Sequence, residues 1–139
     1  MYRKILIAND GSEGAAKALA AAIDVAKRYR AELHMLSVEE IQRLPGTREE
    51  VIGEKELQDR RFADVTRKSQ EQAKHHRVRL ATHVIAGHAV PSIVDFVHAG
   101  GFDLLVVGFM GHSALYNRLI GSTTDRLVDL APCTVLVVK

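Results

Sequence analysis

Glycines mark both ends of a loop near the C-terminus, and their spacing suits the binding of a phosphate chain. Gly108 and Gly111 directly follow an apolar run at residues 104–107. Nine residues then separate Gly111 from Gly121. Glycine lets the backbone approach a ligand closely, and the N–H groups at a helix start attract anions. The alternative is that these glycines only form a turn and cap a helix. Because both ends of the loop are marked, we favour phosphate binding.

The residues after Gly121 predict the helix that such a site needs. Ser122 and Asp125 have the spacing of a capping box, so a helix should begin at about Ser122. Its first N–H groups would point back towards the end of the strand at residues 104–107. Each hydrogen bond to a charged oxygen contributes about 1.5–3 kcal/mol. Three or four of them, together with a buried base, would give roughly micromolar affinity.

This pattern resembles the ATP-binding branch of the universal stress protein family. The resemblance is carried by G-x2-G-x9-G-S from Gly108 to Ser122 and by APCTVLVV at residues 131–138. It extends over essentially the whole chain and includes DGS at residues 10–12. Such a pattern with a long fixed gap is far more specific than a lone GxGxxG. The resemblance implies a mononucleotide ligand, usually ATP, and Mg²⁺ would accompany a bound triphosphate.

Composition narrows the classes of function. A chain of 139 residues is expected to form one domain, residues 1–139. A net charge of +2, 5% aromatic residues and no Trp argue against nucleic-acid binding. The first apolar run meets Asn9 and Asp10 too soon for a signal peptide, and no apolar stretch is long enough to span a membrane. We expect a cytoplasmic protein.

The hydrophobic pattern predicts an α/β fold. Five apolar strands are expected at residues 5–8, 33–38, 78–86, 104–107 and 134–138. A helix from Ala15 and another near Pro91 alternate with them. A long, mostly solvated helix should follow Thr47, and its expected inward contacts are Val51, Leu57, Phe62, Val65 and Ala73. The alternation argues for a parallel sheet with right-handed crossovers.

The hydrophobic pattern alone does not fix the strand order, but the two most site-like turns follow the strands that end at Asp10 and Gly108. Ligands of such sheets bind beyond the carboxyl ends of the strands, where the strand order reverses. Order 3-2-1-4-5 places both turns together, and the resembled family has the same order. We therefore expect an open five-stranded parallel sheet with helices on both faces, Rossmann-like and of the adenine nucleotide alpha hydrolase-like type.

The resemblance also implies the residues of the nucleotide site. Asp10 matches an acid near the ribose and phosphates, although it also suits a turn that caps the first helix together with Ser12. Val38 matches the apolar wall of the adenine pocket. Phe109 departs from the family pattern, because a small hydroxyl residue is common there. The residues implied are Ala8, Asn9, Asp10, Val38, Gly87, Val107, Gly108, Gly111, Gly121, Ser122 and Thr123.

Residues for catalysis are harder to find. The loop has no P-loop lysine, and the seven histidines form no metal-binding motif. We therefore expect a nucleotide-binding stress-response regulator. One alternative is a slow Mg²⁺-dependent ATPase or phosphotransferase that uses Asp10. Another is a partner-binding dimer with an empty pocket. The resemblance implies a homodimer that pairs through the apolar last strand, residues 134–138, an edge that otherwise invites aggregation.

Overall fold

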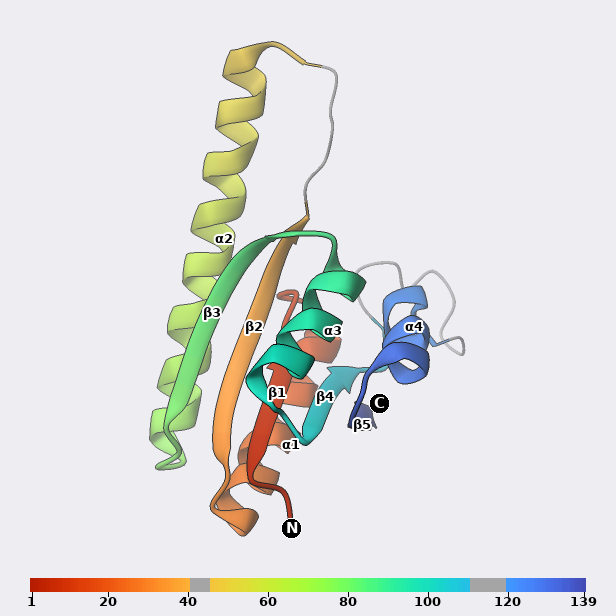
Figure 1. Ribbon diagram of the computed structural model, residues 1–139. Helices are drawn as coiled ribbons and strands as arrows, with labels where there is room; N and C mark the ends of the chain where they lie inside the picture. Colours follow the sequence, from red (N-terminus) through yellow and green to blue (C-terminus); the bar gives the residue numbers. More distant parts are fainter. Residues whose placement is uncertain (41–45, 111–119) are drawn as a thin grey trace.

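The structure, a computed structural model, describes residues 1–40, 46–110 and 120–139. Its strands form one parallel sheet in the order β3-β2-β1-β4-β5, which confirms the predicted topology (Figure 1). The elements along the chain are β1 Lys4–Ala8, α1 Glu13–Tyr29, β2 Glu32–Glu40, α2 Arg48–His75, β3 Leu80–Gly87, α3 Ala89–Gly100, β4 Leu104–Gly108, α4 Ser122–Leu130 and β5 Thr134–Val138.

The two faces of the sheet are covered by different helices. Residues of α1 and Ala73 of α2 pack on one face, against β1 residues such as Ile5 and Ile7. Residues of α3 and Leu127 of α4 pack on the other face, against Leu6 and its neighbours. Successive strand residues point to opposite faces, so the central strands are buried on both sides. This explains why β1 and β4 read as continuous apolar runs.

Helix α1 packs close to the sheet because its buried face consists largely of alanine. Ser12 caps it, accepting a hydrogen bond at 3.2 Å from the amide of Ala15. Its buried residues are Ala15, Ala18, Leu19, Ala22, Ile23 and Ala26. Ala15, Leu19, Ala22, Ile23 and Ala26 recur at the 3.6-residue period of one helix face. The start of α1 is thereby fixed beside the end of β1.

Helix α2 is long and solvated, as predicted, but two of its expected inward contacts are wrong. A capping box formed by Thr47 and Glu50 starts it. Phe62 and Ala73 are buried, whereas the exposed fractions of Val51 and Leu57 are 49% and 66%. The reason is visible in Figure 1, where the first turns of α2 lie beyond the end of the sheet. No sheet surface is available there to cover them.

Glycines lie at the end of α3 and at the start of α4. α3 ends at Gly101, which is in the left-handed conformation with φ 65°. α4 begins at Ser122, but its N-cap is Gly121 and not Ser122, so the predicted capping box is wrong. A glycine N-cap has no side chain to accept from the first amides. No helix in the described part of the chain is long and apolar enough to cross a membrane.

Candidate functional site

The turns after β1 and β4 lie side by side, as the strand order requires. The two strands pair in parallel, with Ile7 opposite Val106. Beyond the strands, the contact continues through backbone. A Cβ added at Gly14, in the first turn of α1, would clash with the carbonyl oxygen of Met110. The start of α1 therefore touches the segment that leads from β4 into the loop.

Hydrogen bonds hold the β1–α1 turn in place. The side-chain oxygen Oδ1 of Asp10 accepts from the amide of Ser12 at 2.9 Å, which confirms the expected turn-forming role. Asn9 is buried, and its Oδ1 accepts from the amide of Gly11 at 2.9 Å. The Asn9 amide group faces Met35 and Ser69 inside the fold. The side chain of Asn9 thus shapes the turn from within.

The start of α4 is tied back to the end of β4. The amide of Gly121 donates to the carbonyl of Phe109 at 2.9 Å. The buried hydroxyl of Thr124 donates to the carbonyl of Gly108 at 2.7 Å. The first-turn amides of a helix have no acceptor within the helix. Those of Ser122 and Thr123 are therefore presented next to the end of β4, the arrangement on which an anion site at this loop depends.

Apolar side chains share one core cluster beneath these turns. Ala8, Val38 and Val107 all pack in the cluster that lies between the sheet and helices α3 and α4. They stand at or near the carboxyl ends of β1, β2 and β4. The centre of the Phe109 ring lies 5.3 Å from Nζ of Lys139. The backbone amide of Phe109 donates to the carbonyl of Val138 in β5. Phe109 is thus anchored on the β5 side of β4, whereas β1 flanks the other side.

One of the implied residues, Gly87, stands apart from this group. Gly87 is the last residue of β3 and pairs with Glu40, two positions beyond Val38 on β2. It therefore lies two strands away from β1, at the edge of the sheet. Gly111 lies outside the described residues, so its part in the loop stays a prediction.

Three features of this region come from contacts between distant elements. The guanidinium of Arg61, from α2, donates to the carbonyl of Asp10 and lies against Gly11. Glu39 of β2 lies beside Asp59 of α2, and burial, followed by the hydrogen bond and negative charge of Asp59, raises the pKa of Glu39. The third is the Thr124 hydroxyl. No short motif in the sequence marks the first two, because they depend on how α2 packs. A hydroxyl in the first turn of α4 was the only signal for the third.

Comparisons with known proteins show the family and the fold. The family model of the universal stress protein family matches residues 1–139. A universal stress protein of Methanocaldococcus jannaschii is 32% identical over 141 residues, covering 100% of this chain and 83% of that protein. The solved structure of universal stress protein UspA from Lactobacillus plantarum has a TM-score of 0.87 at 30% identity, with 99% of this chain and 98% of that chain covered.

Two more distant solved structures contain nucleotides and share the fold. A universal stress protein in complex with cAMP has a TM-score of 0.78 at 23% identity, covering 99% of this chain and 97% of that chain. A family protein from Arabidopsis thaliana with AMP bound has a TM-score of 0.70 at 16% identity, covering 99% and 91%. The full-length family match and the relative at 32% identity decide the assignment: the chain belongs to the universal stress protein family.

Proposed function

We propose that this chain binds an adenine nucleotide, ATP, beside the carboxyl ends of β1 and β4 and acts as a nucleotide-dependent regulator of a stress response. The observation that carries the proposal is the join between the two turns. Gly14 of the β1–α1 side touches Met110 on the β4 side, and Gly121 is hydrogen-bonded back to Phe109. The first amides of α4 and the Asp10 turn thereby border one region.

Each proposed contact has a physical basis. The amides of Ser122 and Thr123 would donate to phosphate oxygens, helped by the positive end of the α4 dipole. Asp10 would accept from a ribose hydroxyl, and Val38 would pack against the base. Arg61, which holds the Asp10 turn, adds a cation at this end of the sheet. Mg²⁺, where it accompanies ATP, would be bound largely by phosphate oxygens and water.

Family members that hold cAMP and AMP support an adenine nucleotide as the class of ligand. A regulator needs only a difference in affinity between two loop states, so the site does not have to hydrolyse ATP. Nucleotide that stays intact over hours with the protein agrees with this role, whereas steady ADP release that Asp10→Ala abolishes would establish an ATPase instead.

Calorimetric titration of ligand-stripped protein tests nucleotide binding directly. ATP should bind with one site per chain and roughly micromolar affinity. AMP should bind more weakly, because it lacks two phosphates that the α4 amides would hold. Absence of heat at millimolar ATP, AMP and cAMP would reject the proposal. Equal affinity for ATP and adenosine would reject the phosphate contacts.

We also propose a homodimer that forms through β5. This strand is at the edge of the sheet, and its apolar residues from Val135 to Val138 are only half-buried. An apolar edge strand is a liability unless something pairs with it or covers it. Sedimentation of the wild type should show a dimer. The Val137→Lys variant, which places a charge on this strand, should sediment as a monomer. A wild-type protein that stays monomeric at high concentration would exclude this dimer.

A further inference from the structure

A cavity of about 720 Å³ lies at the end of the sheet opposite the proposed nucleotide site. It is bordered by the end of α1, the start of β2 and the turn from α2 into β3, the region near the N-terminus in Figure 1. Buried Ala26 and Leu33 contribute to its lining, together with small apolar residues such as Ala81. Its volume is in the range typical of small-molecule sites.

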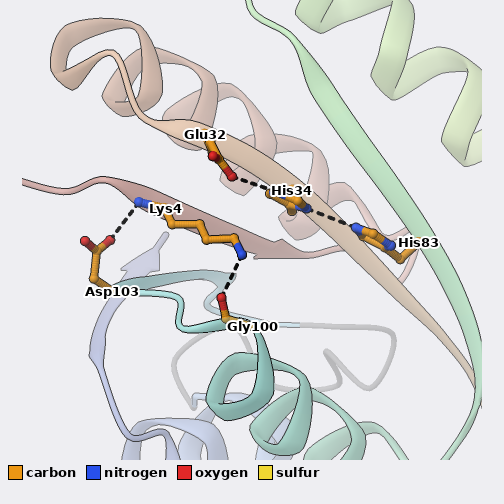
Figure 2. Close-up of polar contacts among 6 residues, drawn as sticks. All are labelled: Lys4, Glu32, His34, His83, Gly100 and Asp103. Atoms are coloured by element: carbon orange, nitrogen blue, oxygen red, sulfur yellow. Dashed lines mark hydrogen bonds and ion pairs between the residues drawn. The ribbon is translucent and has the colours of Figure 1, made fainter.

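Four cationic side chains and one carboxylate belong to the residues that line this cavity. The cations are Lys27, Arg30, Arg77 and Arg79, and all four are exposed. Within the described ranges, none of them forms an ion pair. The carboxylate is Glu32, and its Oε2 lies 3.4 Å from Nε2 of His34 (Figure 2). The positive charge around the cavity is thus left largely uncompensated.

Two of these arginines occupy backbone positions where glycine would be less strained. Arg30 is the C-cap of α1 with φ 54°, and Arg77 follows the C-cap of α2 with φ 60°. L-residues other than glycine rarely adopt this left-handed conformation. In the same chain, α3 ends in the ordinary way with Gly101 at φ 65°. Strained residues cluster at functional sites, and here both arginines line one cavity.

A helix C-terminus by itself favours nearby cations, because its carbonyls carry partial negative charge. That effect is satisfied by lysine, arginine or histidine anywhere in the last turn, and α1 and α2 already carry Lys27, Arg28, Lys74 and His75 there. It does not require arginine at the left-handed position of both helices. It also does not involve Arg79, which follows both helices and leads into β3.

We propose that this cavity binds a small soluble anion that carries at least two phosphate groups. The planar guanidinium group donates pairs of parallel hydrogen bonds to phosphate oxygens, so three arginines suit more than one phosphate. Lys27 adds a point charge beside them. This site is separate from the proposed nucleotide site, since it lies at the opposite ends of the strands.

The test uses inorganic tripolyphosphate as the probe and backbone amide NMR shifts as the readout, at constant ionic strength. Binding should be saturable and should shift the amides of Ala31, Val78 and Ala81. Replacement of both strained arginines, Arg30→Gly with Arg77→Gly, should weaken binding by at least about 10-fold. The melting temperature of this double variant should not fall, because glycine is favoured at both backbone positions.

The matched control is Arg28→Gln with Arg48→Gln. It also removes two positive charges, but from exposed positions outside the cavity. It should bind tripolyphosphate as the wild type does. Equal weakening in both double variants would overturn the proposal, because it would reveal diffuse attraction only. Equal affinity for sulfate would overturn the requirement for several phosphates. Shifts confined to the start of α4 would place the anion at the nucleotide site and overturn the second site. ATP binding by the Arg30→Gly, Arg77→Gly variant is measured as well. It distinguishes failure of the anion site in the cavity from failure of the proposed nucleotide site.

Discussion

Gly108 at the end of β4 lies against Gly14 in the first turn of α1, with no room for a side chain between them. A Cβ added at Gly108 would lie 2.8 Å from both the carbonyl carbon and the carbonyl oxygen of Gly14. These are backbone atoms, so they cannot rotate away. Gly108 is therefore required for the approach of α1 to β4, whatever it contributes to a ligand.

We expect Gly108→Ala to lower the free energy of unfolding by about 1–3 kcal/mol, as is typical of overpacking. Urea denaturation measures this. Gly53→Ala is the matched control, because Gly53 is exposed within α2 and an added Cβ would meet nothing within 4 Å. That change should stabilise the protein by up to about 1 kcal/mol. A Gly108→Ala protein as stable as the wild type would contradict the close contact.

The Thr124 hydroxyl should stabilise the join between β4 and α4. Thr124→Val keeps the shape but leaves the Gly108 carbonyl without this donor, so the free energy of unfolding should fall by about 1–3 kcal/mol. Thr124→Ser retains the hydroxyl and should lose less. The neighbouring Thr123 is exposed, and Thr123→Val should change stability by less than about 0.5 kcal/mol. Equal losses of unfolding free energy in Thr124→Val and Thr123→Val would show that the 2.7 Å hydrogen bond does not stabilise the fold.

A pair of histidines joins β2 to the edge strand β3. Nδ1 of His34 lies 3.0 Å from Nε2 of His83, while Glu32 lies on the other side of the His34 ring (Figure 2). Only one proton fits between the two facing nitrogens. Burial lowers the pKa of His83, and the charges of His34 and Lys4 lower it further.

The sign of the pH dependence follows from this shift. The folded protein holds its His83 proton more weakly than the unfolded chain, whose histidine pKa is near 6.5. Stability is therefore complete above that value and is lost as pH falls through it towards the lower folded pKa. We expect the free energy of unfolding to fall from about pH 7.5 to about pH 5.5. His83→Gln should flatten this slope, whereas His98→Gln, at an exposed position of α3, should not. An unchanged slope in His83→Gln would assign the effect to other groups.

Helix α2 offers a comparison between a covered and an uncovered apolar side chain. Phe62→Ala should cost about 3–5 kcal/mol, because Phe62 is buried. Leu57→Ala should be nearly neutral, because 66% of Leu57 is exposed. Chemical denaturation of the two variants checks both values. Similar losses would mean that the first half of α2 is covered in solution.

The sequence could predict the strands, because buried strands read as continuous apolar runs, and the site-like turns with the family resemblance gave their order. It could not predict which half of α2 meets the sheet. The apolar residues of that helix have an imperfect period, and the length of the neighbouring strands decides which of them are covered. Leu57 was misassigned for that reason.

The positions of the two turns that form the candidate site could be predicted in the same way. Asp10 and Gly108 mark strand ends that the topology brings together. Arg61 and the Glu39–Asp59 pair were missed, since each depends on side chains from elements far apart in sequence. The spacing of Ser122 and Asp125 predicts a cap at Ser122, yet Gly121 occupies the N-cap position of α4.

The most direct test of the central claim compares ATP binding by Gly121→Val and Gly53→Val in calorimetry. Gly121 has φ −60°, which any residue adopts, so valine should leave the fold intact while obstructing the approach of phosphates to the α4 amides. Circular dichroism confirms folding of both variants. We predict that wild type and Gly53→Val bind ATP with the same affinity and that Gly121→Val shows no binding. Undiminished ATP binding by a folded Gly121→Val protein would contradict the account.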